Sequence, residues 1–186
     1  MAEKATTEGP TRSEAFRDLT ASWFRLETLQ VYDVGSDREP FEEFLRTGQI
    51  DASGGAEWRE MISRHVAAGR SLRRVHVVEE PLTDYLRYEI AAYELNHAAG
   101  EEIGLIPVSR GEWPEGLPRD TDFWLIDDEE PGATAWLMDY DDDGGYRGDE
   151  LVLEPEVIET YRRWRDTALS LAVPLNEYIR RDARRV

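Results

Sequence analysis

Apolar residues recur along this chain at two different spacings, and the switches between them predict an α/β fold. Spacings of three and four residues are typical of amphipathic helices and occur over residues 13–20, 37–46, 56–68, 83–99 and 155–173. Short alternating or continuous apolar runs are typical of β-strands and occur over residues 23–32, 72–78, 103–108, 122–127, 133–140 and 146–153. Glycine or proline follows several of these segments, as is common where helices and strands end.

Two segments share one construction that predicts parallel strands. HVAAGRSLRRVHVV at 65–78 and NHAAGEEIGLIPV at 96–108 each place an Ala-Ala-Gly helix end a few residues before a strand. Such a joint is the second half of a βαβ unit, whose two strands run parallel. The last two strands instead flank a short acidic glycine turn. We therefore expect a mixed, partly parallel sheet with helices on both faces.

Polar segments at both ends bound one domain. We expect a disordered tail over residues 1–12, a single α/β domain over residues 13–178 and a basic tail over residues 179–186. A chain of 186 residues is long enough for one hydrophobic core. Six Trp, eight Tyr and five Phe argue against a disordered chain, which would be poor in aromatic residues.

The charge balance restricts the possible partners. Lysine and arginine total 22 against 40 aspartate and glutamate residues, for a formal net charge of −18. Because this charge repels phosphate backbones and anionic membranes, we expect no direct nucleic-acid binding and no membrane binding. No stretch approaches the roughly 20 apolar residues that span a bilayer, and the polar start lacks the apolar core of a signal peptide. These features predict a cytoplasmic protein whose acidity serves solubility or docking on a basic partner.

The inventory of reactive side chains excludes several classes of enzyme. Lys4 is the only lysine, cysteine is absent, and the histidines are His65, His76 and His97. A phosphate-binding loop and a Schiff-base enzyme each need a lysine, which Lys4 in the expected tail is badly placed to supply. Thiol catalysis and cysteine-based zinc sites are excluded outright.

Polar residues beside the predicted strands are the candidate binding residues. Alternation places Arg25 and Glu27 on one face of their strand. A second polar group spans the end of strand 72–78 and the start of helix 83–99, where open α/β sheets bind ligands and a helix N-terminus favours an anion. The candidate ligand-binding residues are Arg25, Glu27, Arg74, His76, Tyr85, Arg87 and Trp124. Arginines would grip an anionic group between aromatic walls; the alternative is ordinary ion pairing, such as Arg87 with Asp84.

Two acidic groups are candidate metal sites. Asp139, Asp141 and Asp143 precede Gly144, and Glu150 stands at the twelfth position, which fits the calcium-loop pattern in full. The neighbouring segments have strand patterns rather than helical ones, so an acidic hairpin turn is the alternative. Carboxylates at 122, 127 and 128 flank a strand and suit magnesium or a solvated loop. We expect no cofactor beyond such a calcium or magnesium ion.

Four separated motifs resemble a known family. WFRLETLQVY, RRVHVVEEPLTDYLRYEI, AAGEEI and DFWLID are similar to segments of an actinobacterial family of single-domain proteins without an assigned activity, often encoded beside helix-turn-helix regulators. The order of elements also resembles one half of the phospholipase-D fold. That superfamily uses a His-x-Lys motif with a following Asp, which this chain lacks, so the resemblance implies a binding or regulatory domain.

These observations lead to one hypothesis and two rivals. We expect a non-catalytic cytoplasmic regulatory protein that binds a small anionic ligand or a partner protein, such as a DNA-binding regulator. The first rival is a metal-assisted hydrolase or phosphotransferase that uses Asp122, Asp127 and the acidic turn. The second is an antitoxin-like acidic interaction protein. The sequence leaves the oligomeric state open.

Overall fold

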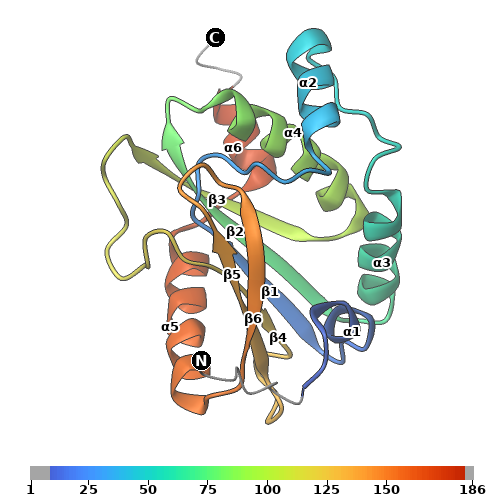
Figure 1. The fold of residues 1–186 in the computed structure, drawn as a ribbon, viewed down its shortest axis with the longest axis vertical. Helices are drawn as coiled ribbons and strands as arrows, with labels where there is room; N and C mark the ends of the chain where they lie inside the picture. The colour runs from blue at the N-terminus through green and yellow to red at the C-terminus, as the bar shows by residue number, and fades with distance from the viewer. Residues whose placement is uncertain (1–8, 183–186) are drawn as a thin grey trace, which may run out of the picture.

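The computed structural model describes residues 9–182, which fold around a seven-stranded sheet (Figure 1). The strand order is β6-β5-β4-β1-β2-β3-β7. β1, β2 and β3 run parallel, and the remaining neighbours pair antiparallel. The strands are β1 Ser22–Glu27, β2 Ser71–Glu80, β3 Glu102–Ser109, β4 Asp122–Ile126, β5 Thr134–Tyr140, β6 Tyr146–Val152 and β7 Val173–Pro174. The predicted mixed, partly parallel sheet is confirmed.

Helices cover both faces of this sheet, also as predicted (Figure 1). They are α1 Arg12–Arg17, α2 Arg38–Thr47, α3 Ala56–Ala67, α4 Asp84–Ala99, α5 Pro155–Leu171 and α6 Leu175–Asp182. α2 and α3 connect β1 to β2, and α4 connects β2 to β3, so the parallel pairs inferred from the Ala-Ala-Gly joints are present. None of the helices within residues 9–182 is long and apolar enough to cross a bilayer.

Because side chains alternate along the central strands, the sheet packs a separate hydrophobic core on each face. Phe24 and Leu26 of β1 pack with the apolar residues of α5. Trp23, from the opposite face of β1, packs with residues of α1 and α3. Further along that same face of the sheet, α4 and α6 pack on β2 and β3. The chemistry discussed below lies between these last two clusters, on the face opposite α5.

β1 is shorter than the extended segment predicted over residues 23–32, because side chains take over its pairing. Thr28 donates through its backbone nitrogen and its hydroxyl to Asp122 Oδ1, both at 2.8 Å. The Gln30 amide then donates to Val77 O at 2.8 Å and accepts from Glu79 N at 2.7 Å. Gln30 thus satisfies β2 backbone groups that a longer β1 would have paired, and the chain is free to leave the sheet after Glu27.

The two ends of the domain also differ from the prediction. Thr11 rather than Ser13 caps α1, in a capping box with Glu14. α6 occupies part of the segment assigned to a basic tail, because Leu175 and Tyr178 are buried against the sheet at helical spacing. Residues 1–8 of the predicted N-terminal tail and 183–186 of the C-terminal tail lie outside the described residues.

Candidate functional site

Four charged or ionisable side chains are buried side by side on β1 and β2. The parallel register sets Arg25 opposite Arg74 and Glu27 opposite His76. Their exposed fractions are 2%, 7%, 5% and 0%, respectively. Alternation therefore places both pairs on the face of the sheet that α4 covers. This many ionisable groups in a dry environment must neutralise one another through close contacts.

Both buried arginines are engaged by carboxylates. Arg74 Nη1 lies 2.8 Å from each oxygen of Glu27, and its Nε donates to Glu101 Oε1 at 3.2 Å. Arg25 Nη2 donates to Asp122 Oδ2 at 2.7 Å. Burial by itself would raise the pKa of Glu27, but Arg74 and Arg25 outweigh burial and hold that pKa well below its usual range. Glu27 is therefore ionised.

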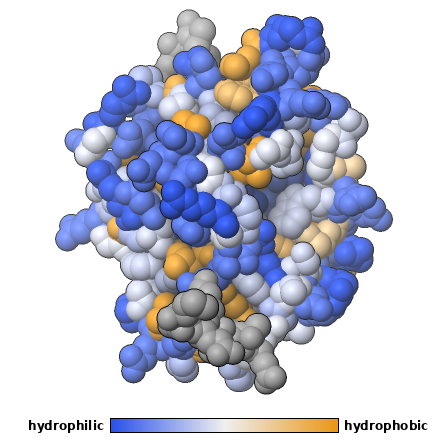
Figure 2. Space-filling view, in the orientation of Figure 1, coloured by the Kyte–Doolittle hydropathy of each residue, from blue (hydrophilic) through white to orange (hydrophobic). Residues whose placement is uncertain are grey.

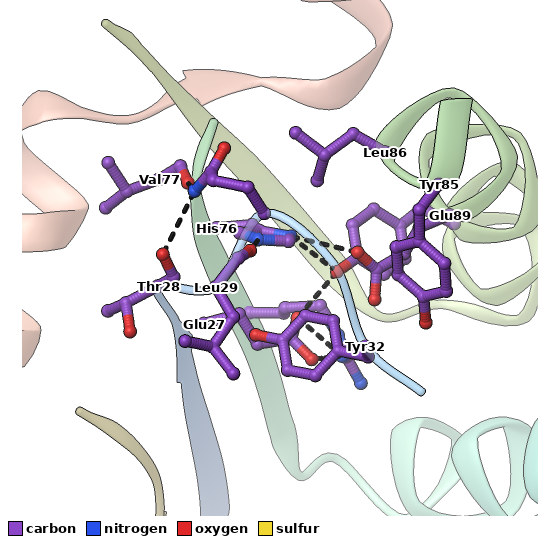
Figure 3. Close-up of polar contacts among 12 residues, drawn as sticks. Glu27, Thr28, Leu29, Tyr32, His76, Val77, Tyr85, Leu86 and Glu89 are labelled. Carbon is purple, nitrogen blue, oxygen red and sulfur yellow. Dashed lines mark hydrogen bonds and ion pairs between the residues drawn. The ribbon is translucent and has the colours of Figure 1, made fainter. Parts of the chain in front are cut away.

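The His76 imidazole lies at the centre of the polar contacts (Figure 3). Its Nε2 is 2.7 Å from Leu29 O, which can only accept, so Nε2 carries a proton and donates. Its Nδ1 faces the Tyr93 hydroxyl at 3.0 Å and Glu89 Oε2 at 3.3 Å. Burial would lower the pKa of His76, but the carboxylates of Glu89 and Glu27 and the Leu29 carbonyl raise it to about 9. His76 is thus an imidazolium at neutral pH.

α4 adds a third set of groups from one side of the helix. Tyr85, Glu89 and Tyr93 recur every four residues and share a face. The Tyr93 hydroxyl donates to Glu27 Oε2 at 2.6 Å. Glu89 Oε2 is buried and makes no hydrogen bond, although it pairs with the charged His76. Burial raises the pKa of Glu89, and the neighbouring His76 offsets only part of this effect.

A cavity of about 520 Å³ opens over this network. Glu27, Arg74 and Glu89 contribute its charged inner surface, and the Arg59 and Asp51 side chains lie near its outer part. Its aromatic lining residues are Tyr32, Trp58, Tyr85, Tyr88, Tyr93 and Tyr140. The face of the molecule drawn in Figure 2 is mainly hydrophilic, with small and separate hydrophobic patches. The site is therefore a pocket with aromatic walls and charged side chains at its base.

A family described as a domain of unknown function (DUF6879) matches residues 10–180. The chain belongs to this family. No curated protein matches the chain. The match includes every strand and reaches into α6, so the pocket lies wholly within the DUF6879 domain.

Six of the seven ligand-binding residues predicted from the sequence gather at this part of the DUF6879 domain. Glu27, Arg74 and Tyr85 line the cavity itself. Arg25 and His76 lie in the network beneath it, and the Trp124 ring packs 5.2 Å from the Arg25 guanidinium and 5.4 Å from that of Arg74.

Arg87, the seventh, lies elsewhere. Its side chain is 60% exposed and pairs with Asp84 at 3.7 Å, which is the alternative that the spacing of these two residues allowed. The reason is helical geometry: Tyr85 and Glu89 face the sheet, and the residue halfway between them must face away.

Several residues of the site were not among the sequence candidates. Glu89 belonged to the polar group at the start of helix 83–99 but was not selected as a ligand-binding residue; Tyr93 follows it after four residues, a spacing that resembles an ordinary buried helix face. Tyr32 donates to Asp122 Oδ2 at 2.6 Å from a segment that had been assigned to a strand. Glu101 reaches Arg74 from the turn between α4 and β3, and local sequence gives no sign of this contact.

The acidic turn does not assemble the predicted calcium ligands. It connects β5 to β6 as a hairpin, and Asp141 Oδ1 accepts from the backbone nitrogens of Asp143 and Gly145 at 3.1 and 2.7 Å. Gly144 has a φ of 84°, and a side chain there would stand 2.3 Å from Val31 O, so packing explains this glycine. Glu150 lies on β6 opposite Leu137 rather than at the tip of the hairpin.

Metal-ligand atoms converge elsewhere. Within residues 9–182, the one group of three acidic or histidine side chains with ligand atoms within 4.8 Å of one another is Glu27, His76 and Glu89.

The aspartates proposed for magnesium are engaged in structural contacts. Asp122 accepts from Arg25, Thr28 and Tyr32. Asp127 accepts from the backbone nitrogens at the start of β1, and Asp128 pairs with Arg165 of α5. Each of these three aspartates therefore already has hydrogen-bond donors or an ion-pair partner within the fold.

Proposed function

We propose that this protein is a non-catalytic recognition domain that binds a small ligand in the cavity beneath α4. The observation that carries the proposal is the buried ionic network at the base of that cavity. Burying an ion costs several kcal/mol, and well-packed apolar side chains in its place are often neutral or stabilising. Folding alone therefore gives no reason to keep such a network, and perturbed ionisable groups in a cleft are characteristic of binding sites.

The charges favour a ligand with a cationic or hydrogen-bond-donating group. The buried Arg25 and Arg74 are already paired with Glu27, Glu101 and Asp122, and Arg59 at the cavity donates to the backbone carbonyls of Gly54 and Ala52. Glu89 instead presents a buried carboxylate oxygen whose charged partner is His76, with Nδ1 at 3.3 Å. Tyrosine and tryptophan rings around such a carboxylate attract positive charge through their faces. This assignment replaces the small anionic ligand that the arginine content suggested.

A non-catalytic role is supported by the state of the imidazole. Both nitrogens of His76 are engaged, Nε2 with Leu29 O and Nδ1 with Tyr93 and Glu89. A general base needs a free lone pair pointing at its substrate. We further propose that the protein has a regulatory role and acts in the cytoplasm. We also propose that its fold is related to one half of the phospholipase-D fold. The net charge of −18 suits docking on a basic regulator protein.

A cavity-filling variant tests this function. Ala92 lines the cavity on α4, whereas Ala98 is exposed on the same helix. We expect members of a library of small amines to bind the wild-type chain in ligand-observed NMR. Ala92→Phe should abolish that binding by occupying the space, and the matched control Ala98→Phe should retain it. Equal binding by the two variants, or no binding to the wild type, would contradict the proposal.

A further inference from the structure

Three side chains from separate elements converge at the base of the cavity. Glu27 ends β1, His76 is its register partner on β2, and Glu89 comes from α4. One potential ligand atom from each lies within 4.8 Å of the other two. The side chains of Glu27, His76 and Glu89 are 7%, 0% and 13% exposed. The strands and a helix of 16 residues fix these positions, so the group is rigidly held.

The histidine is oriented as metal-binding histidines usually are. Such residues donate their second ring N–H to a carbonyl or carboxylate, which fixes the tautomer and aims the other nitrogen at the ion. His76 Nε2 makes this contact with Leu29 O at 2.7 Å. Its Nδ1 consequently points toward Glu89 and the Glu27–Tyr93 hydrogen bond (Figure 3).

The charge of the surrounding network is compatible with a bound divalent cation. Four buried or largely buried carboxylates belong to it: Glu27, Glu89, Glu101 and Asp122. Two guanidiniums, Arg25 and Arg74, oppose them. With a neutral imidazole, four negative charges against two positive ones leave an excess of two. A divalent cation balances this excess completely; a proton on His76 balances half of it, and balancing the rest would take a second proton on Glu89 or Glu101, whose pKa values are raised by burial.

We infer that Glu27, His76 and Glu89 bind a divalent first-row transition-metal ion at the base of the cavity. This inference deepens the proposed ligand-binding function and rests on it. One imidazole and two carboxylates are ligands that suit Zn²⁺. Mg²⁺ and Ca²⁺ prefer oxygen-only ligand sets, so the nitrogen discriminates against them. The cavity above would leave coordination positions for water or a ligand atom.

Binding the ion requires two local changes. His76 Nδ1 gives up its proton to solvent when the ion takes its lone pair. A carboxylate oxygen has two acceptor positions, and Glu27 Oε2 uses them on Arg74 and Tyr93. The ion therefore takes the position now held by the Tyr93 hydroxyl, while the contact between Glu27 and Arg74 remains.

Zn²⁺ titration of the chelator-treated full chain tests the site. We expect one Zn²⁺ per chain by calorimetry, and a visible absorption band when Co²⁺ is used instead. Glu89→Gln should weaken Zn²⁺ binding at least about tenfold, because even an outer-shell partner contributes about 10–100-fold. Glu94→Gln, an exposed position on the same helix, is the matched control and should bind as the wild type does. Circular dichroism verifies that each variant is folded.

Tyr93→Phe tests the site in the opposite direction from Glu89→Gln, because it should not weaken Zn²⁺ binding. It removes the hydroxyl that competes for Glu27 Oε2 and should bind Zn²⁺ at least as tightly as the wild type. Weaker binding by Tyr93→Phe, equal binding by the two glutamine variants, or no Zn²⁺ binding at all would overturn the metal site. The amine screen with the two alanine variants, repeated on chelator-treated protein, shows separately whether the cavity binds small molecules.

Discussion

The two faces of the central strands use the same backbone for different purposes. Toward α5, the side chains of β1, β2 and β4 are mostly apolar, including Phe24, Leu26, Val75, Val77 and Phe123; charge on this face is confined to one end, where Asp128 pairs with Arg73 and Arg165. Toward α4, residues at alternate positions of β1 and β2 are Arg25, Glu27, Arg74 and His76. Burial of apolar area stabilises the fold, whereas buried charge costs free energy unless it is paired. The α5 face therefore provides much of the stability of the fold. This stability allows the α4 face to hold a site whose buried charges cost free energy.

Truncation on the α5 face should have the largest effect on folding. Phe123 is fully buried and stacks on Tyr161 with ring centroids 4.3 Å apart. Phe123→Ala should lower the free energy of unfolding by about 3–5 kcal/mol, measured by urea denaturation, because it leaves a cavity in a packed core. The Zn²⁺ affinity of the folded fraction should not change. A loss of affinity as large as that of Glu89→Gln would show that the two faces are not independent.

Breaking the network on the α4 face should cost slightly less. Arg74→Met removes the partner of Glu27 and Glu101 and should lower the free energy of unfolding by about 3 kcal/mol. This is the low end for a broken buried pair, because burial already raises the pKa of Glu101, which can then take up a proton. Adding Glu27→Leu to Arg74→Met should recover much of the loss. A double variant no more stable than the single one would mean that the network stabilises the fold by itself.

Asp127, which binds the start of β1 away from the cavity, should make a pH-dependent contribution to the free energy of unfolding. Burial would raise the pKa of Asp127, but hydrogen bonds from Thr20, Ala21 and Ser22 outweigh it and lower the pKa below its usual 3.8. A depressed pKa contributes stability above the unfolded-state value, which is lost as pH falls through the folded-state value. Asp127→Asn should therefore cost about 1–2 kcal/mol at pH 7 and progressively less below about pH 4, by urea denaturation at each pH. If the difference in the free energy of unfolding between the wild type and Asp127→Asn did not depend on pH, the ionised carboxylate of Asp127 would not be its cause.

The smallest effect is expected at the cavity wall. Tyr32→Phe removes the hydrogen bond to Asp122 Oδ2, which still accepts from Arg25. We expect a loss of about 1 kcal/mol in thermal or urea denaturation, the usual net contribution of one hydrogen bond. A loss above about 3 kcal/mol would mean that the aromatic wall is part of the folding core.

The sequence predicted regular elements well where the signals are local. Thr83 caps α4 by accepting from Leu86 N, and the alternation in β1 put Arg25 and Glu27 on one face as expected. The end of β1 could not be predicted, because it depends on Gln30 reaching the backbone of a strand 47 residues away. The partner of Arg25 was equally hidden, since Asp122 is 97 residues distant.

The same distinction applies to the site. Residue type and alternation identified individual candidates, but ion pairing decides what each can bind. Arg74 looked like an anion receptor in the sequence and is in fact engaged by two carboxylates. The calcium-loop pattern fitted at every position, yet the Asp141 carboxylate stabilises a hairpin turn. Contacts between distant segments are therefore the reason that we now propose a ligand with a cationic or hydrogen-bond-donating group.

Anomalous diffraction from a crystal soaked in Zn²⁺ tests the central claim most directly, namely that the α4 face retains buried charge in order to bind a cation. Data collected above and below the zinc absorption edge locate the ion independently of any affinity measurement. The account predicts that the strongest anomalous peak lies between Glu27, His76 and Glu89 and is absent from Glu89→Gln crystals. A peak confined to other residues, or one that persists in Glu89→Gln, would contradict it.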